Sequence, residues 1–529
     1  MFIIKSSAIN IASILLLLIY LSIGDVSANE SSPIIQKKDN VIIIVADQMR
    51  RSAMGFWSKP EFKNQLNGVS DPVFTPNIDE LAARGVIFNN AISNYPLCSP
   101  FRGMLMSGIY PNKNGVSNNT RKDRDIGLKL DIEAITDVLF QSGYNTSLFG
   151  KGHWHVNKPL FDENGNYKGT DKSPGGHFIK DTDYDTYIPP GKSRHSIEYW
   201  YQNVSHNHKN PVIYSSDPTA IDGKKDGEAY RNGIYSTVSQ ADQIIEYIEN
   251  SRGQRDSSKP FSMLWAMDPP HNPYDSINDT DEEIYNTYYK DVDIDKILNR
   301  PNVDKETAKK YAKFYFSMIT LIDREIGRVV KTLQEQGLTE NTLILFTADH
   351  GEMMGSHGKM HKNDIYEESL SIPFIVTYPN KLSHRVDNLL ISVPDIMPTV
   401  LGLLDISNEI PTEVDGVDYS SILIDPNNTK VARPTSSLYI GKIGELGVRT
   451  HQYTYAINKN GALIALYDNQ QDPYQLTSLT FKDIPNENSN LLKKELGCWL
   501  TSIDHSVVTE KKFPKMITYP TQPNSCETH

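Results

Sequence analysis

Cys98 stands in the stretch Cys98-Ser99-Pro100-Phe101-Arg102, in a chain that has only three cysteines. A proline just after the cysteine suits the first turn of a helix, and Arg102 follows one turn later, so the two side chains share a helical face. The positive end of that helix favours an anion beside residue 98. A cation and a helix N-terminus also lower the pKa of a thiol, so the segment predicts a reactive residue, with an unmodified buried cysteine as the alternative.

Polar residues that can bind metals follow two hydrophobic runs. VIIIVA leads into Asp47 and Gln48, and TLILFTA leads into Asp349 and His350. Runs of this kind, without polar alternation, are typical of strands covered on both faces of a parallel sheet. Ligands bind beyond the carboxyl ends of such strands. We therefore expect the two pairs of residues to meet in one shared site.

The elements around these residues alternate between strands and helices. SLFGK, FSMLWAMD and IPFIVTYP are further candidate strands, and helices are expected from Thr75 as N-cap to Gly85 and over 305–336. This alternation to about residue 425 predicts an α/β fold, a large doubly wound sheet domain with mixed or parallel strands. Beyond residue 433 the pattern changes to a hairpin that turns at Asn460-Gly461, which predicts a smaller antiparallel sheet.

The chain is expected to have three parts, namely a signal peptide over 1–28, a catalytic domain over 29–425 and a small sheet subdomain over 426–529. The apolar run INIASILLLLIYLSI is followed by Val26-Ser27-Ala28, which is typical of a secretory cleavage site. Fifteen apolar residues are few for a spanning helix, so we expect a secreted or periplasmic protein without a stable membrane anchor, an uncleaved anchor being the alternative.

An oxidising compartment favours disulfides, and Cys498 and Cys526 are the pair expected to form one, which leaves Cys98 over. The chain has 53 basic and 65 acidic side chains and a net charge of -12. This balance argues against nucleic acids and anionic membranes as partners. An anionic substrate must therefore meet a local cluster of positive charge.

The segment Cys98-Ser99-Pro100-Phe101-Arg102 resembles the C-x-P-x-R core of the formylglycine-dependent sulfatases, the type I sulfatases of the alkaline phosphatase superfamily. Further motifs resemble this family in the family's own order, over most of residues 40–480. They are VADQ, FGKGHWH, PHNPY, TADHGEMMGSHG, HKNDIYEES and LYDNQQDPYQL. The resemblance implies a sulfuric ester hydrolase with an alkaline phosphatase-like fold.

In that family the motif cysteine is oxidised to an aldehyde, so the resemblance implies a formylglycine at Cys98, made by a formylglycine-generating enzyme. The aldehyde hydrate would attack sulfur in line and then lose sulfate by elimination. A thiolate at the same place would form an adduct that lacks a second hydroxyl on the same carbon, so it could not release sulfate by elimination.

The resemblance also assigns a metal site. Asp47, Gln48, Asp349 and His350 would hold a divalent cation, most simply calcium, which prefers oxygen ligands. Gln48 stands where the family often has a second acid, and His350 stands where it often has Asn. A nitrogen ligand is softer, so the identity of the metal stays open.

Positive charge for the sulfate would come from Arg102, Lys151 and Lys362. Among the histidines, His271 resembles the acid that protonates the departing alcohol, and His153 resembles the residue that helps to release sulfate. His155 lies two residues further and remains an alternative to His153. Weaker candidates are His357, Arg194 and His195, the last two for contacts to substrate.

A secreted enzyme with these motifs favours a sulfated oligo- or polysaccharide as substrate, and a marine galactan such as carrageenan is the first expectation. An arylsulfatase and a phosphodiester or phosphonate ester hydrolase of the same superfamily are alternatives. A non-catalytic protein that binds sulfated glycans is a third. The presence of Cys98, Arg102, Lys151 and Lys362 together argues against the last of these.

Overall fold

The computed structural model describes residues 38–62, 64–121, 124–156, 185–204, 207–520 and 526. The expected signal peptide lies outside these residues. The main sheet has nine strands in the order β5-β4-β3-β6-β1-β7-β8-β2-β9. Its strands are β1 (Asn40–Ala46), β2 (Val86–Phe88), β3 (Asn145–Gly150), β4 (Tyr199–Val204), β5 (Val212–Ser215), β6 (Phe261–Met267), β7 (Thr342–Ala348), β8 (Phe374–Thr377) and β9 (Arg385–Asp387).

The middle of this sheet is parallel from β4 through β3, β6 and β1 to β7, and β5 and β8 pair with it in antiparallel fashion. Every residue of β1 and β7 is buried, as expected for hydrophobic strands covered on both faces. The doubly wound α/β fold expected from the sequence is confirmed.

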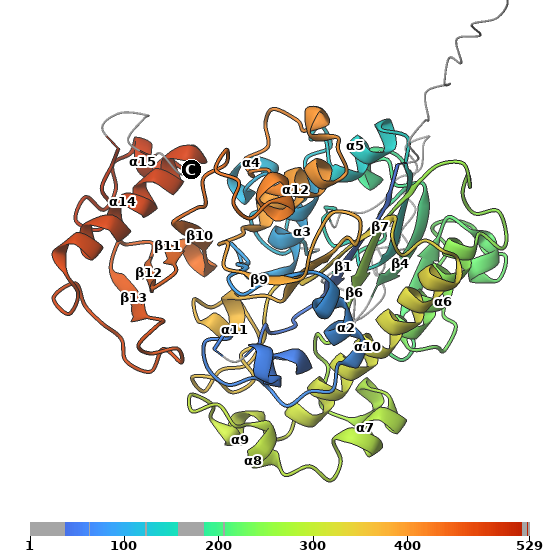
Figure 1. Cartoon of the computed structure of the whole chain (residues 1–529), viewed down its shortest axis with the longest axis horizontal. Coiled ribbons are helices and arrows are strands. Elements are labelled where there is room, and N and C mark those ends of the chain that lie inside the picture. The colour runs from blue at the N-terminus through green and yellow to red at the C-terminus, as the bar shows by residue number, and fades with distance from the viewer. Residues whose placement is uncertain are drawn as a thin grey trace, which may run out of the picture. The chain divides into compact units, whose positions relative to one another are not determined.

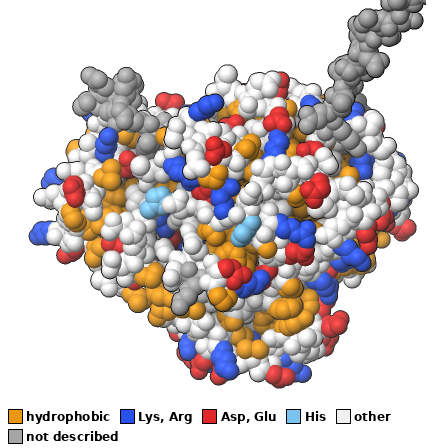
Figure 2. All heavy atoms as spheres, in the orientation of Figure 1, with side chains coloured by type: hydrophobic (Ala, Val, Ile, Leu, Met, Phe, Trp, Pro, Cys, Tyr) orange, Lys and Arg blue, Asp and Glu red, His pale blue; other side chains and the backbone are white. Residues whose placement is uncertain are grey.

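Helices cover both faces of the sheet. Figure 1 shows α2, α6 and α10 together on one side, and α3, α5 and α12 on the other. The α-helices are α2 (Pro76–Arg84), α3 (Cys98–Ser107), α4 (Pro111–Asn114), α5 (Ile135–Gln141), α6 (Ser236–Glu249), α7 (Glu282–Tyr288), α8 (Ile294–Ile297), α9 (Lys305–Ala308), α10 (Ala312–Glu335), α11 (Glu367–Leu370), α12 (Ile396–Leu403), α13 (Ser420–Ile424), α14 (Asn486–Ser502) and α15 (Ser506–Thr509). Acidic and basic side chains are interspersed over the face shown in Figure 2.

The register of the parallel strands places their ends at one level. Ala46, the last residue of β1, pairs with Met267 of β6 on one side and with Ala348 of β7 on the other. The next residue of each strand is an aspartate, so three carboxylates leave the sheet side by side. The shared edge expected from the sequence for two of these strands therefore has a third acidic member, Asp268.

Two helix predictions need correction. Helix α2 has the expected bounds, but the Thr75 side chain does not cap it. Asp323 of α10 accepts hydrogen bonds from the backbone N–H groups of Asn77 (3.2 Å) and Ile78 (2.7 Å) instead. The single helix expected over 305–336 is divided into α9 and α10. Upstream of α9 the chain is held to a distant loop, since the Asp304 N–H donates to the Gly355 carbonyl at 2.8 Å.

A second sheet of four antiparallel strands lies toward the C-terminus, in the order β10 (Ser436–Ile440), β11 (Leu446–Thr450), β12 (Tyr453–Ile457) and β13 (Leu463–Asp468). The hairpin turn at Asn460-Gly461 joins β12 to β13 as expected, because Gly461 supplies the left-handed φ of 76°. Cys498 of α14 and Cys526 form a disulfide, the pair expected from the sequence. Within the described residues, every helix is too short or too polar to cross a membrane.

A buried ion pair ties the second sheet to the main one. Arg449 of β11 is fully buried and donates from Nε to the Glu367 carboxylate of α11 at 2.8 Å. Arg51, which follows β1, approaches the same carboxylate at 3.7 Å. Burial opposes ionisation of Glu367, but the charge and hydrogen bond of Arg449 together with the charge of Arg51 outweigh it and lower the pKa to about 2.

Glu367→Gln should therefore change how the free energy of unfolding depends on pH. The folded pKa of Glu367 is depressed, so the stabilisation it contributes is fully present above pH 4.5 and is lost as the pH falls toward 2. A shift of this size corresponds to about 3 kcal/mol. The free energy of unfolding should differ between wild type and variant at neutral pH, and the difference should shrink across that window.

Denaturant titrations at a series of pH values measure this difference. Glu340→Gln, at an exposed position, is the matched control and should leave the profile unchanged. A difference that stayed constant down to pH 2 would show that the Glu367 carboxylate is not held in its ionised form.

Candidate functional site

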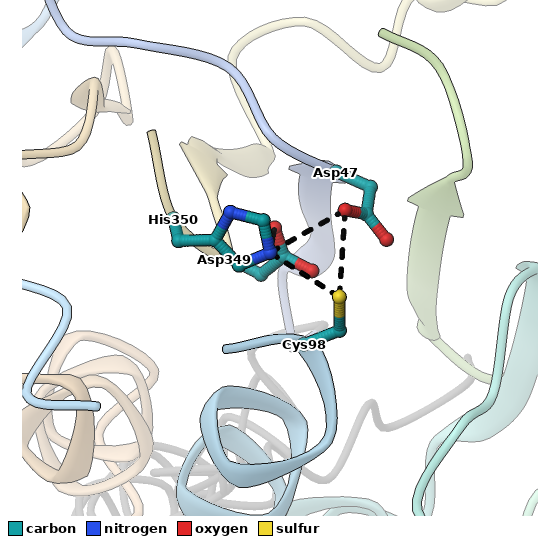
Figure 3. Close-up of side chains that lie close together, drawn as sticks. All are labelled: Asp47, Cys98, Asp349 and His350. Carbon is teal, nitrogen blue, oxygen red and sulfur yellow. Dashed lines mark hydrogen bonds and ion pairs between the residues drawn. The ribbon is translucent and has the colours of Figure 1, made fainter. Parts of the chain in front are cut away.

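The helix α3 begins at Cys98, at the carboxyl edge of the main sheet. The Cys98 Sγ lies 3.2 Å from His350 Nε2 and 3.7 Å from Asp47 Oδ1. Figure 3 shows Asp47, Cys98, Asp349 and His350 pointing toward one another, with the cysteine at the start of its helix. One ligand atom from each of the four residues lies within 4.8 Å of the others. The expected juxtaposition of the motif cysteine with both strand ends is present in the structure.

The lowered pKa that a helix N-terminus and a nearby cation would favour for the thiol is not found. Burial, with the carboxylate of Asp47 in second place, raises the pKa of Cys98 to about 12. Arg102 does not counter this, because its guanidinium is directed to Asp349 at 3.3 Å and to Asp47 at 3.5 Å. The unmodified side chain is therefore a neutral thiol.

The donor set fits a divalent cation. His350 Nδ1 donates to the Gly351 carbonyl at 3.0 Å, so the lone pair of Nε2 faces the two carboxylates, 3.6 Å from Asp47 and 3.4 Å from Asp349. Burial lowers the pKa of His350, which keeps that lone pair available. Two carboxylates suit calcium, whereas the imidazole and the thiol suit softer metals.

Gln48 lies beside this cluster with a left-handed φ of 68°, a conformation that costs energy in residues other than glycine. Its backbone N–H donates to Asp349 Oδ1 at 3.0 Å. Its side-chain amide donates to the Glu352 carboxylate, and its Oε1 accepts from Lys362 Nζ at 2.5 Å. These bonds turn the amide oxygen of Gln48 toward Lys362. Gln48 thus links Asp349, one of the four clustered residues, to this lysine.

Lys151 is carried into the same cluster by β3. Its Nζ donates to Asp47 Oδ2 at 2.7 Å and to Asp268 Oδ1 at 3.1 Å. The preceding Gly150 has a φ of 104°, and a Cβ there would lie 2.0 Å from the Ala266 carbonyl, so only glycine allows this close approach. Burial opposes ionisation of Asp47, but Lys151 and the other nearby cations outweigh it and hold its pKa well below the usual range.

Two residues of this network, Asp268 and His208, were not predicted. Asp268 follows β6 as Asp47 follows β1, so the strand-end pattern of FSMLWAMD could have revealed it. His208 is buried, with Nδ1 3.3 Å from Asp268 Oδ2, and its Nε2 donates to the His271 carbonyl at 2.8 Å. Nothing in the surrounding sequence marks it.

His271 and Lys362 form a close pair. His271 Nδ1 donates to the Asn272 carbonyl at 2.6 Å, which leaves Nε2 to accept from Lys362 Nζ at 2.6 Å. Because Lys362 also donates to Gln48, its ammonium group lies between the expected acid and the cluster. The Lys362 ammonium group can hold an anion where the His271 imidazole can transfer a proton.

These residues open onto a cavity of about 360 Å³. His153 is buried in its wall with a φ of 60°, another left-handed residue just after a strand. His155 lies elsewhere, and burial together with the charge of His195 lowers its pKa to about 4. The geometry therefore favours His153 over His155. The cavity is lined by Leu97, Cys98, Asn119, Lys151, His153, His271, Asn272, His361, Lys362 and Asn363.

The weaker sequence candidates have other contacts. Arg194 is buried, pairs with Asp226 at 2.7 Å and lies over the Trp200 ring. His195 Nδ1 lies 3.1 Å from Asp137 Oδ2. His357 stacks on a tyrosine ring, with 3.7 Å between the ring centroids. These contacts indicate structural roles for all three.

The relation to known proteins agrees with this geometry. The family model described as Sulfatase matches residues 39–406, which is most of the chain. The chain belongs to the sulfatase family. A second model, described as N-sulphoglucosamine sulphohydrolase, C-terminal, matches residues 355–500 of this sulfatase. The reaction class of this chain is therefore the hydrolysis of sulfuric esters, as the resemblance implied.

Among curated relatives, this sulfatase is 37% identical to an endo-4-O-sulfatase of Bacteroides thetaiotaomicron, over 91% of this chain and 95% of the relative. It is 28% identical to an ulvan-active sulfatase of Formosa agariphila, over 87% of this chain and 81% of the relative. A solved structure from a study of glycosaminoglycan metabolism in B. thetaiotaomicron is 37% identical, with a TM-score of 0.83, and covers 91% of this chain and 100% of its own. This likeness confirms the expected fold.

Asp268→Asn should lower the kcat/KM of the sulfatase by about 10- to 100-fold, the usual cost of losing a supporting partner. Lys151 would keep only one of its two carboxylates, and His208 would lose its charged partner. Turnover of a small aryl sulfate measures the effect, and Asp291→Asn at an exposed position is the control. A folded Asp268→Asn protein with wild-type kcat/KM would show that Asp268 does not support the catalytic groups.

Proposed function

We propose that this sulfatase removes 4-O-sulfate groups from galacto-configured sugars of a sulfated polysaccharide, with a formylglycine derived from Cys98 and a divalent cation, calcium. The observation that carries the proposal is the cluster of Cys98 with both strand ends, which opens onto a cavity lined by Lys151, Lys362 and His271. This arrangement surrounds one reactive residue with cations that suit a sulfate ester.

The position of the sulfate rests on the relatives. The endo-4-O-sulfatase is 37% identical to this chain. A solved structure whose title names a neocarrahexaose complex is 19% identical and shares the fold alone. Chondroitin 4-sulfate and κ-carrageenan share an axial 4-O-sulfate on a galacto-configured ring. We therefore take chondroitin 4-sulfate as the first candidate substrate, and a marine galactan with the same sulfate ester, such as κ-carrageenan, as the second.

The catalytic residues have separate tasks in this proposal. Lys151 and Lys362 bind the sulfate oxygens, and Arg102 fixes the carboxylates of Asp47 and Asp349. His271, protonated at Nε2 when the substrate is bound, delivers that proton to the departing sugar oxygen, while the neighbouring Lys362 keeps its charge and faces the sulfate. His153, which also lines the cavity, accepts the proton that residue 98 gives up. The formylglycine would supply an oxygen nucleophile in place of the neutral thiol.

The cation would be held by Asp47, Asp349, the Nε2 of His350 and the side-chain oxygen of Gln48. When bound, it would offset charge at the sulfate oxygens. Because a formylglycine-generating enzyme acts on the chain before it functions, maturation is part of the proposal. The polysaccharide substrate and the apolar N-terminal run together support a secreted or periplasmic site of action.

Release of inorganic sulfate from defined oligosaccharides tests the proposed substrate. Protein produced with a formylglycine-generating enzyme should act on chondroitin 4-sulfate, and more slowly on κ-carrageenan. It should prefer chondroitin 4-sulfate to chondroitin 6-sulfate by about a hundredfold or more, because only one regioisomer places its ester at residue 98. Cys98→Ala is the inactive control.

Three outcomes would contradict this proposal. Faster turnover of the 6-O-sulfate would refute the assigned position. Faster turnover of a phosphodiester than of every sulfate ester would favour the alternative activity of the superfamily. An enzyme restricted to aryl sulfates would refute a polysaccharide substrate.

Removal of the metal should lower kcat by at least about a hundredfold, because the buried carboxylates would then repel the sulfate. After dialysis against a chelator, Ca²⁺ should restore activity and raise the unfolding temperature. Restoration by Zn²⁺ alone would assign a softer metal to the imidazole-containing site. Full activity in chelated protein would exclude a role for the cation.

A further inference from the structure

A second cavity, of about 420 Å³, lies between the loops around α3 and the C-terminal sheet. We call it the basic groove. Its walls include Tyr95, Asn118, Ile443, Lys459, Lys512 and Phe513. They come from the segment before α3, from the loop after α4, from the turns of the four-stranded sheet and from the segment after α15.

The charge of the basic groove is opposite in sign to that of the chain as a whole. Lys459 and Lys512 carry this charge, since burial lowers the pKa of His505, which also lines the groove, and none of its described lining residues is acidic. Lys512 pairs with Glu510, whereas Lys459 makes no ion pair within the described residues. Two larger cavities elsewhere are each lined by several carboxylates as well as by basic side chains, with Asp217 and Arg252 in one and Glu133 and Lys192 in the other. In a chain of net charge -12, such a groove is complementary to an anion.

The basic groove also presents apolar surface. Ile443 is 74% exposed at the tip of the 3₁₀ turn over Lys442–Gly444. It has a left-handed φ of 58°, which costs energy in a β-branched residue. Phe513 and Tyr95 add ring surface on the other walls. A ligand with apolar ring faces and anionic substituents matches this combination, and a sulfated sugar has both.

Two segments of the chain join the basic groove to the catalytic cavity. Asn118 lines the groove and Asn119 lines the catalytic cavity; similarly, Tyr95 lines the groove and Leu97 the catalytic cavity. Arg124 fixes one junction, donating from Nη1 to Asn118 Oδ1 at 2.6 Å and to the Asn119 carbonyl at 3.2 Å. The same two segments therefore line both cavities, and Arg124 is bonded to one of them.

We infer that the basic groove binds a sulfated sugar unit of the same chain whose ester is cleaved at residue 98, so that the polysaccharide extends from the catalytic cavity toward the C-terminal sheet. This inference rests on the proposed function. The chain would be gripped at a sugar on one side of the cleaved ester, with Lys459 and Lys512 facing its sulfate or carboxylate groups. Longer substrates would then be bound more tightly than short ones.

The test combines Lys459→Ala with Lys512→Ala. The ratio of kcat/KM for a chondroitin 4-sulfate hexasaccharide to that for a small aryl sulfate should fall about tenfold, since two partly exposed charge contacts are lost. The matched control combines Lys296→Ala with Lys331→Ala, at exposed positions on α8 and α10, and should leave the ratio unchanged. An unchanged ratio in the groove variant would overturn the inference.

A binding measurement separates this inference from the proposed function. In the inactive Cys98→Ala background, calorimetry with the same hexasaccharide should give a Kd about tenfold higher when both groove lysines are replaced. Equal Kd values would overturn the groove. A wild-type protein that binds the hexasaccharide through the groove lysines but cleaves no sulfate from it would refute the proposed substrate and leave the groove established.

Discussion

The buried carboxylate of Asp47 is the interaction on which the rest of the site depends. It is fully buried at the end of the central strand, which would be unfavourable for an isolated charge. Lys151 at 2.7 Å and Arg102 at 3.5 Å compensate it, and both cations are themselves buried. The same carboxylate helps to keep the Cys98 thiol neutral. Removing it would leave Lys151 with Asp268 alone and Arg102 with Asp349 alone, and would change the surroundings of residue 98.

This compensation follows from strand register. Four neighbouring parallel strands deliver Lys151, Asp268, Asp47 and Asp349 to one edge of the sheet, so opposite charges are placed within hydrogen-bonding reach by the backbone itself. Hydrophobic strands covered on both faces cannot slip in register without exposing apolar side chains to water. The rigid core thus fixes the positions of charged groups that would otherwise repel or seek solvent.

Much of this could be predicted from sequence because it is local. The buried strands, the residues that end them and the start of a helix at Cys98 are all visible in short patterns. The errors concern distant partners. Asp323 caps a helix that lies about 245 residues earlier in the chain, and the cap expected at Thr75 is absent. The pKa of the thiol rises because of burial and Asp47, neither of which appears in the motif. His208 lies in the short connection between β4 and β5, whose residues carry no pattern that marks a buried partner of Asp268.

The central claim is that residue 98 acts as an oxygen nucleophile, made from the cysteine by oxidation. The most direct measurement is the mass of the peptide that contains residue 98, from active protein made alongside a formylglycine-generating enzyme. The account predicts a mass in which the sulfur of Cys98 is replaced by an aldehyde oxygen, in a fraction that rises in proportion to kcat. Fully active protein that contains only unmodified cysteine at this position would contradict it.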